Sequence, residues 1–198
     1  MARVLALHDG ERVTIRSSTP ELLDMAAEWK PAGPEHKPPY HFHPLQDERF
    51  VIHEGEFTVQ LAGRTTVLRS GDSFDMPRGT PHKMWNSGGS VTRATWQVRP
   101  ALRTEQFFTA VHEMRAAGAT GKGGMITMPA AGMIFNAFPD EFRLVMPELA
   151  RRPAIALLAA IGRLRGYRRV RAGRVAESRP PTAGWVSSAV AACFQVSC

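Results

Sequence analysis

Three histidines and one glutamate in the first half of the chain have the residue types and the spacing of a metal site. His41 and His43 are two residues apart, so in an extended strand their imidazoles point to the same side. Glu48 follows after a gap that fits a tight corner between strands, and His82 comes directly after residues 79–81 (Gly-Thr-Pro), where another strand would begin. Taken singly, each has an ordinary explanation as a surface, core or solvated residue. Their combination predicts that the four side chains meet at one site in the interior.

Two longer patterns contain these residues. Residues 41–55 read H-x-H-x4-E-x6-G, and residues 71–86 read G-x5-P-x-G-x2-H-x3-N. This order resembles both signature motifs of the cupin superfamily, and the positions that match in the second motif are Gly71, Pro77, Gly79, His82 and Asn86. One position departs from the pattern, because Glu35 stands where the family usually has a glycine. The resemblance covers about residues 10–100.

The resemblance implies a mainly β fold, a single antiparallel cupin (jelly-roll) β-barrel with C-terminal helices, as in small bacterial single-domain cupins. It assigns one divalent metal ion to the barrel interior, with His41, His43, Glu48 and His82 as ligands. Three neutral imidazoles and one carboxylate leave a divalent ion with a charge of about +1 and with open positions for water, dioxygen or a chelating substrate. Fe2+, Mn2+, Ni2+, Co2+ and Zn2+ all accept such ligands, so the sequence does not select the metal.

Other side chains in this half could support the chemistry. Glu48 could act as a base as well as a ligand. Gln46 and Asn86 could hydrogen-bond to the ligands or, equally, stabilise turns. His53 has the opposite strand parity to Glu48 and is expected to face outward. Candidates for the wall of a substrate pocket, with ordinary core packing as the alternative, are Phe50, Met76, Met84 and Trp96.

Several functions are compatible with this site. The leading hypothesis is a metal-dependent, oxygenase-type enzyme whose small oxygen-bearing organic substrate, such as a phenol, enol, keto acid or hydroxy acid, chelates the metal. A non-catalytic small-molecule-binding or sensing protein is the first alternative, and a metal-dependent isomerase or decarboxylase is the second. A structural role, in which the barrel forms a homodimer and the basic C-terminal end makes contacts, is the third.

The elements that must position these residues are strands. Residues 11–99 contain short runs rich in β-branched and aromatic residues, separated by Gly, Pro, Asp and Asn. Between residues 48 and 61 apolar side chains recur at period two on either side of a Glu54-Gly55 break, which predicts strand, turn and strand. Prolines on both sides of residues 40–43 predict a short strand or a sheet-edge segment there.

The periodicity becomes helical after residue 103. A helix is predicted from Thr104, as its N-cap, to Gly118, followed by a connector over residues 119–132. Two further helices are predicted over 140–146 and 153–164, the second with Pro153 in its first turn. We expect these helices to pack on the outside of the sheet or on a second subunit; the alternative is a lid over its open end.

Composition and charge limit the remaining possibilities. The 198 residues carry a net charge of +7, but residues 1–150 are nearly neutral and the excess lies in 151–198, which hold nine arginines and one glutamate. We therefore expect a cupin barrel over 10–100, a helical extension over 101–165 and a poorly ordered Arg-rich tail over 166–198. Nucleic acid and membrane are not expected as partners. The two cysteines lie in the last six residues, and we expect a cytoplasmic protein.

Overall fold

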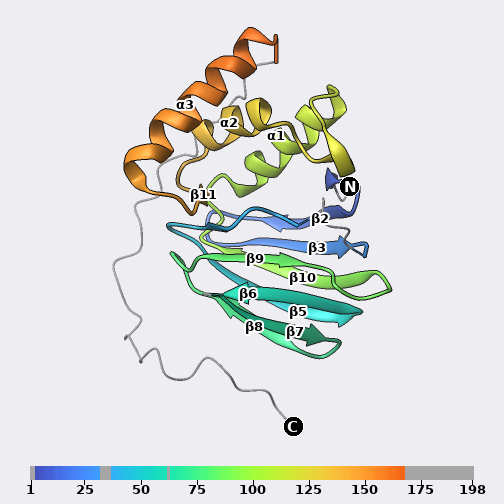
Figure 1. Cartoon of the computed structure of the whole chain (residues 1–198). Coiled ribbons are helices and arrows are strands. Elements are labelled where there is room, and N and C mark those ends of the chain that lie inside the picture. Colours follow the sequence, from blue (N-terminus) through green and yellow to red (C-terminus); the bar gives the residue numbers. More distant parts are fainter. Residues whose placement is uncertain (1–2, 32–36, 62, 168–198) are drawn as a thin grey trace.

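The computed structural model describes residues 3–31, 37–61 and 63–167. It shows two antiparallel β-sheets packed face to face, with helices stacked along one side of the pair (Figure 1). The predicted class, mainly β with antiparallel strands and C-terminal helices, is confirmed. Glu35 and almost all of the predicted Arg-rich tail lie outside the described residues.

Within the described residues, eleven strands form the two sheets. The larger sheet has the spatial order β1 (Arg3–His8), β2 (Glu11–Ser18), β3 (Leu23–Trp29), β10 (Thr92–Arg99), β5 (Asp47–Glu54) and β8 (Ser73–Met76). The smaller sheet has the order β11 (Arg143–Leu144), β4 (His41–Phe42), β9 (His82–Trp85), β6 (Glu56–Leu61) and β7 (Arg64–Arg69). The predicted short strand near residue 41 is therefore present, but β11 covers what would be its free edge.

The core lies between the sheets and follows strand parity. In β3, alternate residues from Leu23 to Trp29 are buried, and β10 repeats the pattern with Ala94, Trp96 and Val98. Because successive side chains point to opposite faces, each strand contributes one apolar row to the interior and one polar row to solvent. This alternation places the site residues of β4, β5 and β9 on the inner side.

The break at Gly55 moves the chain from one sheet to the other. β5 pairs with β10 and β8, whereas β6 pairs with β7 and β9, so the two predicted strands follow each other without forming a hairpin. Gly55 has φ +76°, and a Cβ there would lie 2.6 Å from the Val91 carbonyl oxygen and 2.9 Å from the Thr92 Cα. Only glycine fits this corner without moving backbone.

Two strands of the larger sheet were not predicted. β3 is built from Leu, Asp, Met, Ala, Ala, Glu and Trp, which lack β-branched residues and include good helix formers. β1 contains only a short apolar stretch. Both strands form because they pair with β2 and, for β3, also with β10, an interaction between segments far apart in the sequence.

The helices differ from the prediction in their positions. α1 spans Thr104–Ala116 and is followed by Gly118 at φ +78°, as expected, but its N-cap is Arg103 rather than Thr104. Part of the predicted connector is helical, as the short η2 (Lys122–Gly124) and as α2 (Met128–Ala137), which has a proline in its first turn. The Gly and Pro residues of this segment made a helix unexpected from the sequence. α2 forms nonetheless, because it packs on α3.

The other two predicted helices also need correction. The helix over 140–146 is wrong, because Arg143 and Leu144 pair with β4 as β11. α3 spans Glu148–Leu164 and begins five residues before Pro153, which lies inside it rather than in its first turn. Tertiary pairing overrides local propensity in the first case.

The helices cover the open side between the two sheets, as in the alternative prediction of a lid. α1 packs on β1, α2 packs on α1 and α3, and Figure 1 shows them stacked beside β1, β2 and β11. Side chains of α1 and α2 line the same cavity as residues of both sheets. Packing on the outer face of a sheet, which we expected, is therefore not found in the described residues. None of the helices that the structure describes is long and apolar enough to cross a membrane.

Replacing Gly55 by alanine is expected to destabilise the protein far more than the same change at Gly79. Both glycines have φ +76°, so both variants acquire about 1 kcal/mol of backbone strain. Only Gly55→Ala adds a clash with backbone, expected to cost a further 1–3 kcal/mol or so, because nothing lies within 4 Å of a Cβ at Gly79. Urea denaturation measures the difference, and equal losses in the two variants would contradict this account of the corner.

Candidate metal centre

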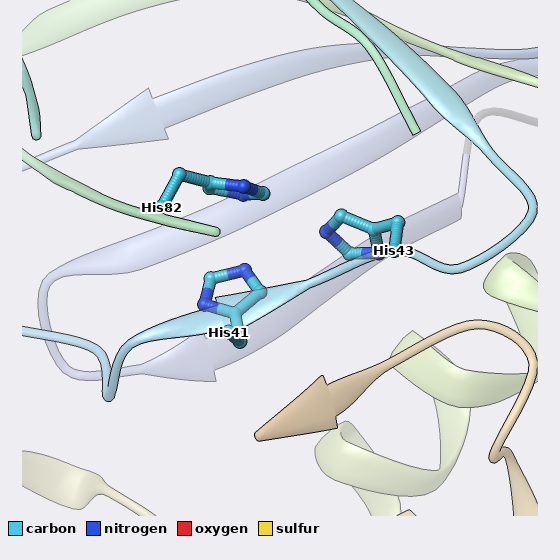
Figure 2. Close-up of side chains that lie close together, drawn as sticks. All are labelled: His41, His43 and His82. Atoms are coloured by element: carbon cyan, nitrogen blue, oxygen red, sulfur yellow. The ribbon is translucent and has the colours of Figure 1, made fainter. Parts of the chain in front are cut away.

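Three imidazoles from two neighbouring strands face one another in the interior. His41 in β4 is the register partner of His82 in β9, and His43 follows two residues after His41. Their ring centroids are 4.4 Å (His41–His82), 5.2 Å (His41–His43) and 5.4 Å (His43–His82) apart. One nitrogen from each ring lies within 4.8 Å of the other two. Figure 2 shows the three rings around a common space.

Backbone carbonyls fix which nitrogen faces that space. Nδ1 of His41 lies 2.9 Å from the Pro39 carbonyl oxygen, Nδ1 of His82 lies 2.8 Å from that of Thr80, and Nδ1 of His43 contacts that of Glu141. A carbonyl oxygen only accepts hydrogen bonds, so each Nδ1 carries the proton and donates it. Each Nε2 is left with a lone pair, as a neutral histidine that ligates metal requires.

Glu48 brings a carboxylate oxygen to the same place. Its side chain is 1% exposed, and its Oε2 lies 3.3 Å from Nε2 of His43 and 3.4 Å from Nε2 of His82. Its other oxygen, Oε1, accepts a hydrogen bond of 3.0 Å from the indole N–H of Trp96. Among the described residues, Glu48 Oε2 and His82 Nε2 are buried atoms that no hydrogen bond satisfies.

Burial sets the charge state of the cluster. It lowers the pKa of His41 well below its usual value, with further lowering by His82 and His43, and it lowers the pKa of His43 to about 4. It also lowers the pKa of His82. For Glu48, burial raises the pKa to about 7, against the opposing effects of His82 and the Trp96 hydrogen bond. The imidazoles are therefore neutral, and the carboxyl group lacks a compensating positive charge.

The donor set fits a divalent cation. Lone pairs on imidazole nitrogens and a carboxylate oxygen repel each other unless a proton or a cation lies between them. A mixed nitrogen and oxygen set of this kind suits the first-row transition metals and zinc. The cluster of His41, His43 and His82 could hold such an ion, and Glu48 is placed to join it.

The segment after α2 supplies part of the site, which the sequence did not reveal. β11 pairs with β4 through Leu144 and His41, and the Glu141 carbonyl accepts the hydrogen bond from His43. The ring of Phe142 stacks on His41 with 4.4 Å between centroids and an angle of 17°. No sequence pattern marked residues 141–144 as neighbours of the histidines, because the contact depends on the fold of the intervening helices.

A buried ion pair holds Glu141 in position. Its side chain is 2% exposed and forms a bidentate pair with Arg103, whose Nε and Nη2 lie 2.9 and 3.1 Å from the two carboxylate oxygens. The Arg103 backbone N–H also donates to Glu141 Oε1. The start of α1 is thereby tied to the backbone that orients His43.

A cavity of about 250 Å³ adjoins the cluster and has an aromatic wall. His41, His43 and Glu48 line it, while His82 is fully buried behind them. The aromatic side chains that line it are Trp29, Phe57, Trp96, Phe107, Phe108, Phe135 and Phe142. Helices and sheets therefore enclose one apolar space that opens onto the candidate ligands.

The four predicted pocket residues divide into two groups. Met84 and Trp96 line the cavity. Phe50 and Met76 are buried in the core and are not among its lining residues. Phe50 faces inward as its parity requires, but its ring packs on Trp96 at 5.3 Å and on Phe57 at 5.9 Å, so these two rings occupy the lining positions.

Gln46 and Asn86 have the turn-stabilising contacts that were the alternative for each. The Gln46 amide nitrogen lies 2.7–2.9 Å from the Pro100 and Ala101 carbonyls and from Thr104 Oγ1, which joins the β4–β5 loop to the start of α1. The Asn86 amide donates to the carbonyls of Trp29 and Ser90. None of these hydrogen bonds reaches the described histidines of the cluster.

Comparison with known proteins gives a family match over the same segment. Residues 31–98 match the family model described as "Cupin domain". This stretch contains the three histidines of the cluster and Glu48, and it ends before α1. An uncharacterized protein, YdbB of Bacillus subtilis (strain 168), is 40% identical over 45 residues, which is 22% of this chain and 40% of that protein.

Solved structures align with about half of the chain at low identity. KdgF from Halomonas sp. aligns with 21% identity over 50% of this chain and 86% of its own, with a TM-score of 0.44. An RmlC-like cupin from Shewanella frigidimarina NCIMB 400 aligns with 20% identity over 53% and 89%, with a TM-score of 0.46.

Replacing Arg103 by glutamine is expected to destabilise the protein by about 3 kcal/mol, because it leaves the Glu141 carboxylate buried without its charged partner. Arg78, which forms a bidentate pair with Asp47 at the surface, is the control: Arg78→Gln is expected to cost less than about 1 kcal/mol. Urea denaturation measures both. A loss in Arg103→Gln no larger than that of the control would show that the buried pair does not hold residue 141.

Proposed function

We propose that this chain, whose residues 31–98 match the cupin-domain family model, binds one divalent metal ion through His41, His43, His82 and Glu48 and acts as an oxygenase-type enzyme. Its substrate would be a small, largely apolar organic molecule that carries an oxygen group able to bind the metal. The observation that supports this most strongly is the group of three imidazoles whose nitrogens lie within 4.8 Å of one another, with Glu48 Oε2 3.3 Å from Nε2 of His43 and 3.4 Å from Nε2 of His82. That set is costly to bury without a cation.

The protein groups would define what the metal can do. A bound divalent ion would supply Lewis acidity and, for iron, manganese, nickel or cobalt, redox chemistry with dioxygen. His41, His43, His82 and Glu48 would hold it, and the aromatic cavity lies next to His41, His43 and Glu48. A substrate in the cavity would therefore meet the metal with its oxygen group.

Glu48 would have a second task beyond ligation. Its Oε1 is fixed by the Trp96 indole, which leaves Oε2 as the atom that faces the histidines. Oε2 would be the atom able to take a proton from a hydroxyl or enol group of a substrate in the cavity. The Trp96 hydrogen bond would keep the carboxylate in place during this transfer.

Aromatic side chains would exclude water from this chemistry. Phe142 covers His41 and is itself stacked against Phe135 at 4.7 Å and Phe107 at 5.5 Å. These rings come from the helical segment and form the part of the cavity wall over the histidines. Closing an active site from water strengthens its electrostatic interactions and suppresses side reactions.

Metal binding is the first test. Purified without chelator, the protein is expected to contain one equivalent of metal, and the metal-free form is expected to bind Co2+ or Zn2+ with stoichiometry one and an increase in melting temperature. His82→Ala removes a lone pair from the cluster and is expected to weaken binding at least 100-fold. His53→Ala, which changes an exposed histidine on the outer face, is expected to leave binding unchanged. Unchanged affinity in His82→Ala would disprove the ligand assignment.

Turnover is the second test. Metal-loaded protein is expected to consume dioxygen with at least one of four probe classes: catechols, enols, 2-keto acids and 2-hydroxy acids. Trp96→Phe keeps an aromatic ring in the wall but removes the donor to Glu48, and is expected to lower kcat about tenfold while metal content is unchanged. Trp85→Phe, the same change at a tryptophan that is not among the lining residues of the cavity, is the control and should not affect kcat. Tight probe binding with no oxygen uptake would instead support the non-catalytic binding protein.

A further inference from the structure

We propose that the cavity has a second polar end, formed by Glu11 and His8, and that this end binds the ammonium group of the ligand. The inference deepens the proposed function, on which it rests for the metal end only. It specifies the substrate class as an amine that carries an apolar or aromatic body and a metal-binding oxygen group. Glu11 and His8 line the same cavity as His41, His43 and Glu48, yet neither belongs to the histidine cluster.

Glu11 stands at a position where strand parity calls for an apolar residue. In β2 the inward row is Glu11, Val13 and Ile15, and the latter two are buried in the core. Glu11 is the register partner of Trp29, an inward residue of β3, so the two side chains lie on the same face of the sheet. The Glu11 side chain is 17% exposed. A carboxylate there is directed into the cavity rather than to solvent.

A β-bulge brings His8 to the same face. The register between β1 and β2 shifts between Ala6 and His8, and His8 then pairs with Glu11. As a result Leu7 and His8, which are consecutive in the sequence, both line the cavity. Bulges of this kind redirect a side chain and occur often beside functional sites.

The hydrogen bonds of this pair leave acceptor capacity on the carboxylate. The Gly10 backbone N–H donates to His8 Nδ1 at 3.1 Å, and His8 Nε2 lies 3.0 Å from Glu11 Oε2. This contact uses one of about four acceptor positions on the carboxylate.

The surroundings of Glu11 favour an ammonium group over a neutral donor. Among the described residues that line the cavity there is no lysine or arginine, so no basic side chain of the wall compensates the carboxylate. Trp29, the register partner of Glu11, also lines the cavity, and aromatic rings attract cations. A carboxylate and an indole ring in an otherwise apolar wall favour a ligand cation.

Two tryptophans connect the two ends of the cavity. Trp29 lies beside Glu11, its ring centroid is 6.1 Å from that of Trp96, and Trp96 donates to Glu48 at 3.0 Å. The space between the amine-binding end and the histidines is thus bordered by aromatic rings. A ligand with its amine at Glu11 and its oxygen group at the histidines would place its apolar middle along these rings.

The test compares an ammonium probe with a matched neutral probe on metal-free protein, so that it does not depend on the metal. 4-Phenylbutylammonium is expected to bind at least tenfold more tightly than 4-phenylbutanol in calorimetric titrations. Glu11→Gln is expected to abolish this preference, and Glu11→Asp, which keeps the charge, to retain part of it. Glu21→Gln, the same change at an exposed position, is expected to leave the preference intact. Thermal unfolding of each variant confirms that it is folded.

A second arm uses zinc-loaded protein and 4-(ω-aminoalkyl)catechols of increasing chain length, against 4-alkylcatechols of the same lengths. One chain length is expected to give the largest ammonium preference, lost in Glu11→Gln. Equal binding of the ammonium and neutral probes to metal-free protein, or a preference that persists in Glu11→Gln, would overturn the proposal. A preference in metal-free protein together with failure to bind zinc would uphold the amine site and reject the proposed metal function.

Discussion

The hydrogen bonds from three imidazole Nδ1 atoms to backbone carbonyls are the constraint on which the site depends. They fix the tautomer of each histidine and aim three lone pairs at one point, where a buried carboxylate oxygen joins them. Burial lowers the pKa values of these histidines and raises that of Glu48 to about 7, so the imidazoles are neutral and the carboxyl group can take up a proton near neutral pH. The three histidines could hold a cation, and the surrounding fold fixes their orientation.

One of those carbonyls belongs to a distant part of the chain, which changes the role of the helices. The Glu141 carbonyl orients His43, the buried Arg103–Glu141 pair fixes Glu141, and the Gln46 amide ties the β4–β5 loop to the start of α1. The helices and β11 are thus structural members of the candidate site. The predicted boundary between a barrel and an extension near residue 100 divides residues that act together, and whether residues 10–100 fold alone stays a prediction.

The sequence predicted what local spacing can encode and missed what distant pairing creates. Strand parity was enough to place His41, Glu48 and Phe50 inside, because the period of a strand depends only on neighbouring residues. β3 and β11 were missed, since their residues have weak β-propensity and form strands only by pairing with segments far along the chain. For the same reason Phe142 and Glu141 had no signal in the sequence.

The covering of the cavity follows from the way the two sheets end. β1 and β11 are edge strands of the two sheets. Leu7 of β1 and Leu144 of β11 both line the cavity, together with side chains of α1 and α2. A sandwich left open there would expose aromatic side chains and the buried histidines to water. Covering that side with apolar helices turns an open edge into an enclosed, low-dielectric space. In such a space the few polar groups that remain in the wall, at the histidines and at Glu11, have their strongest influence on what binds.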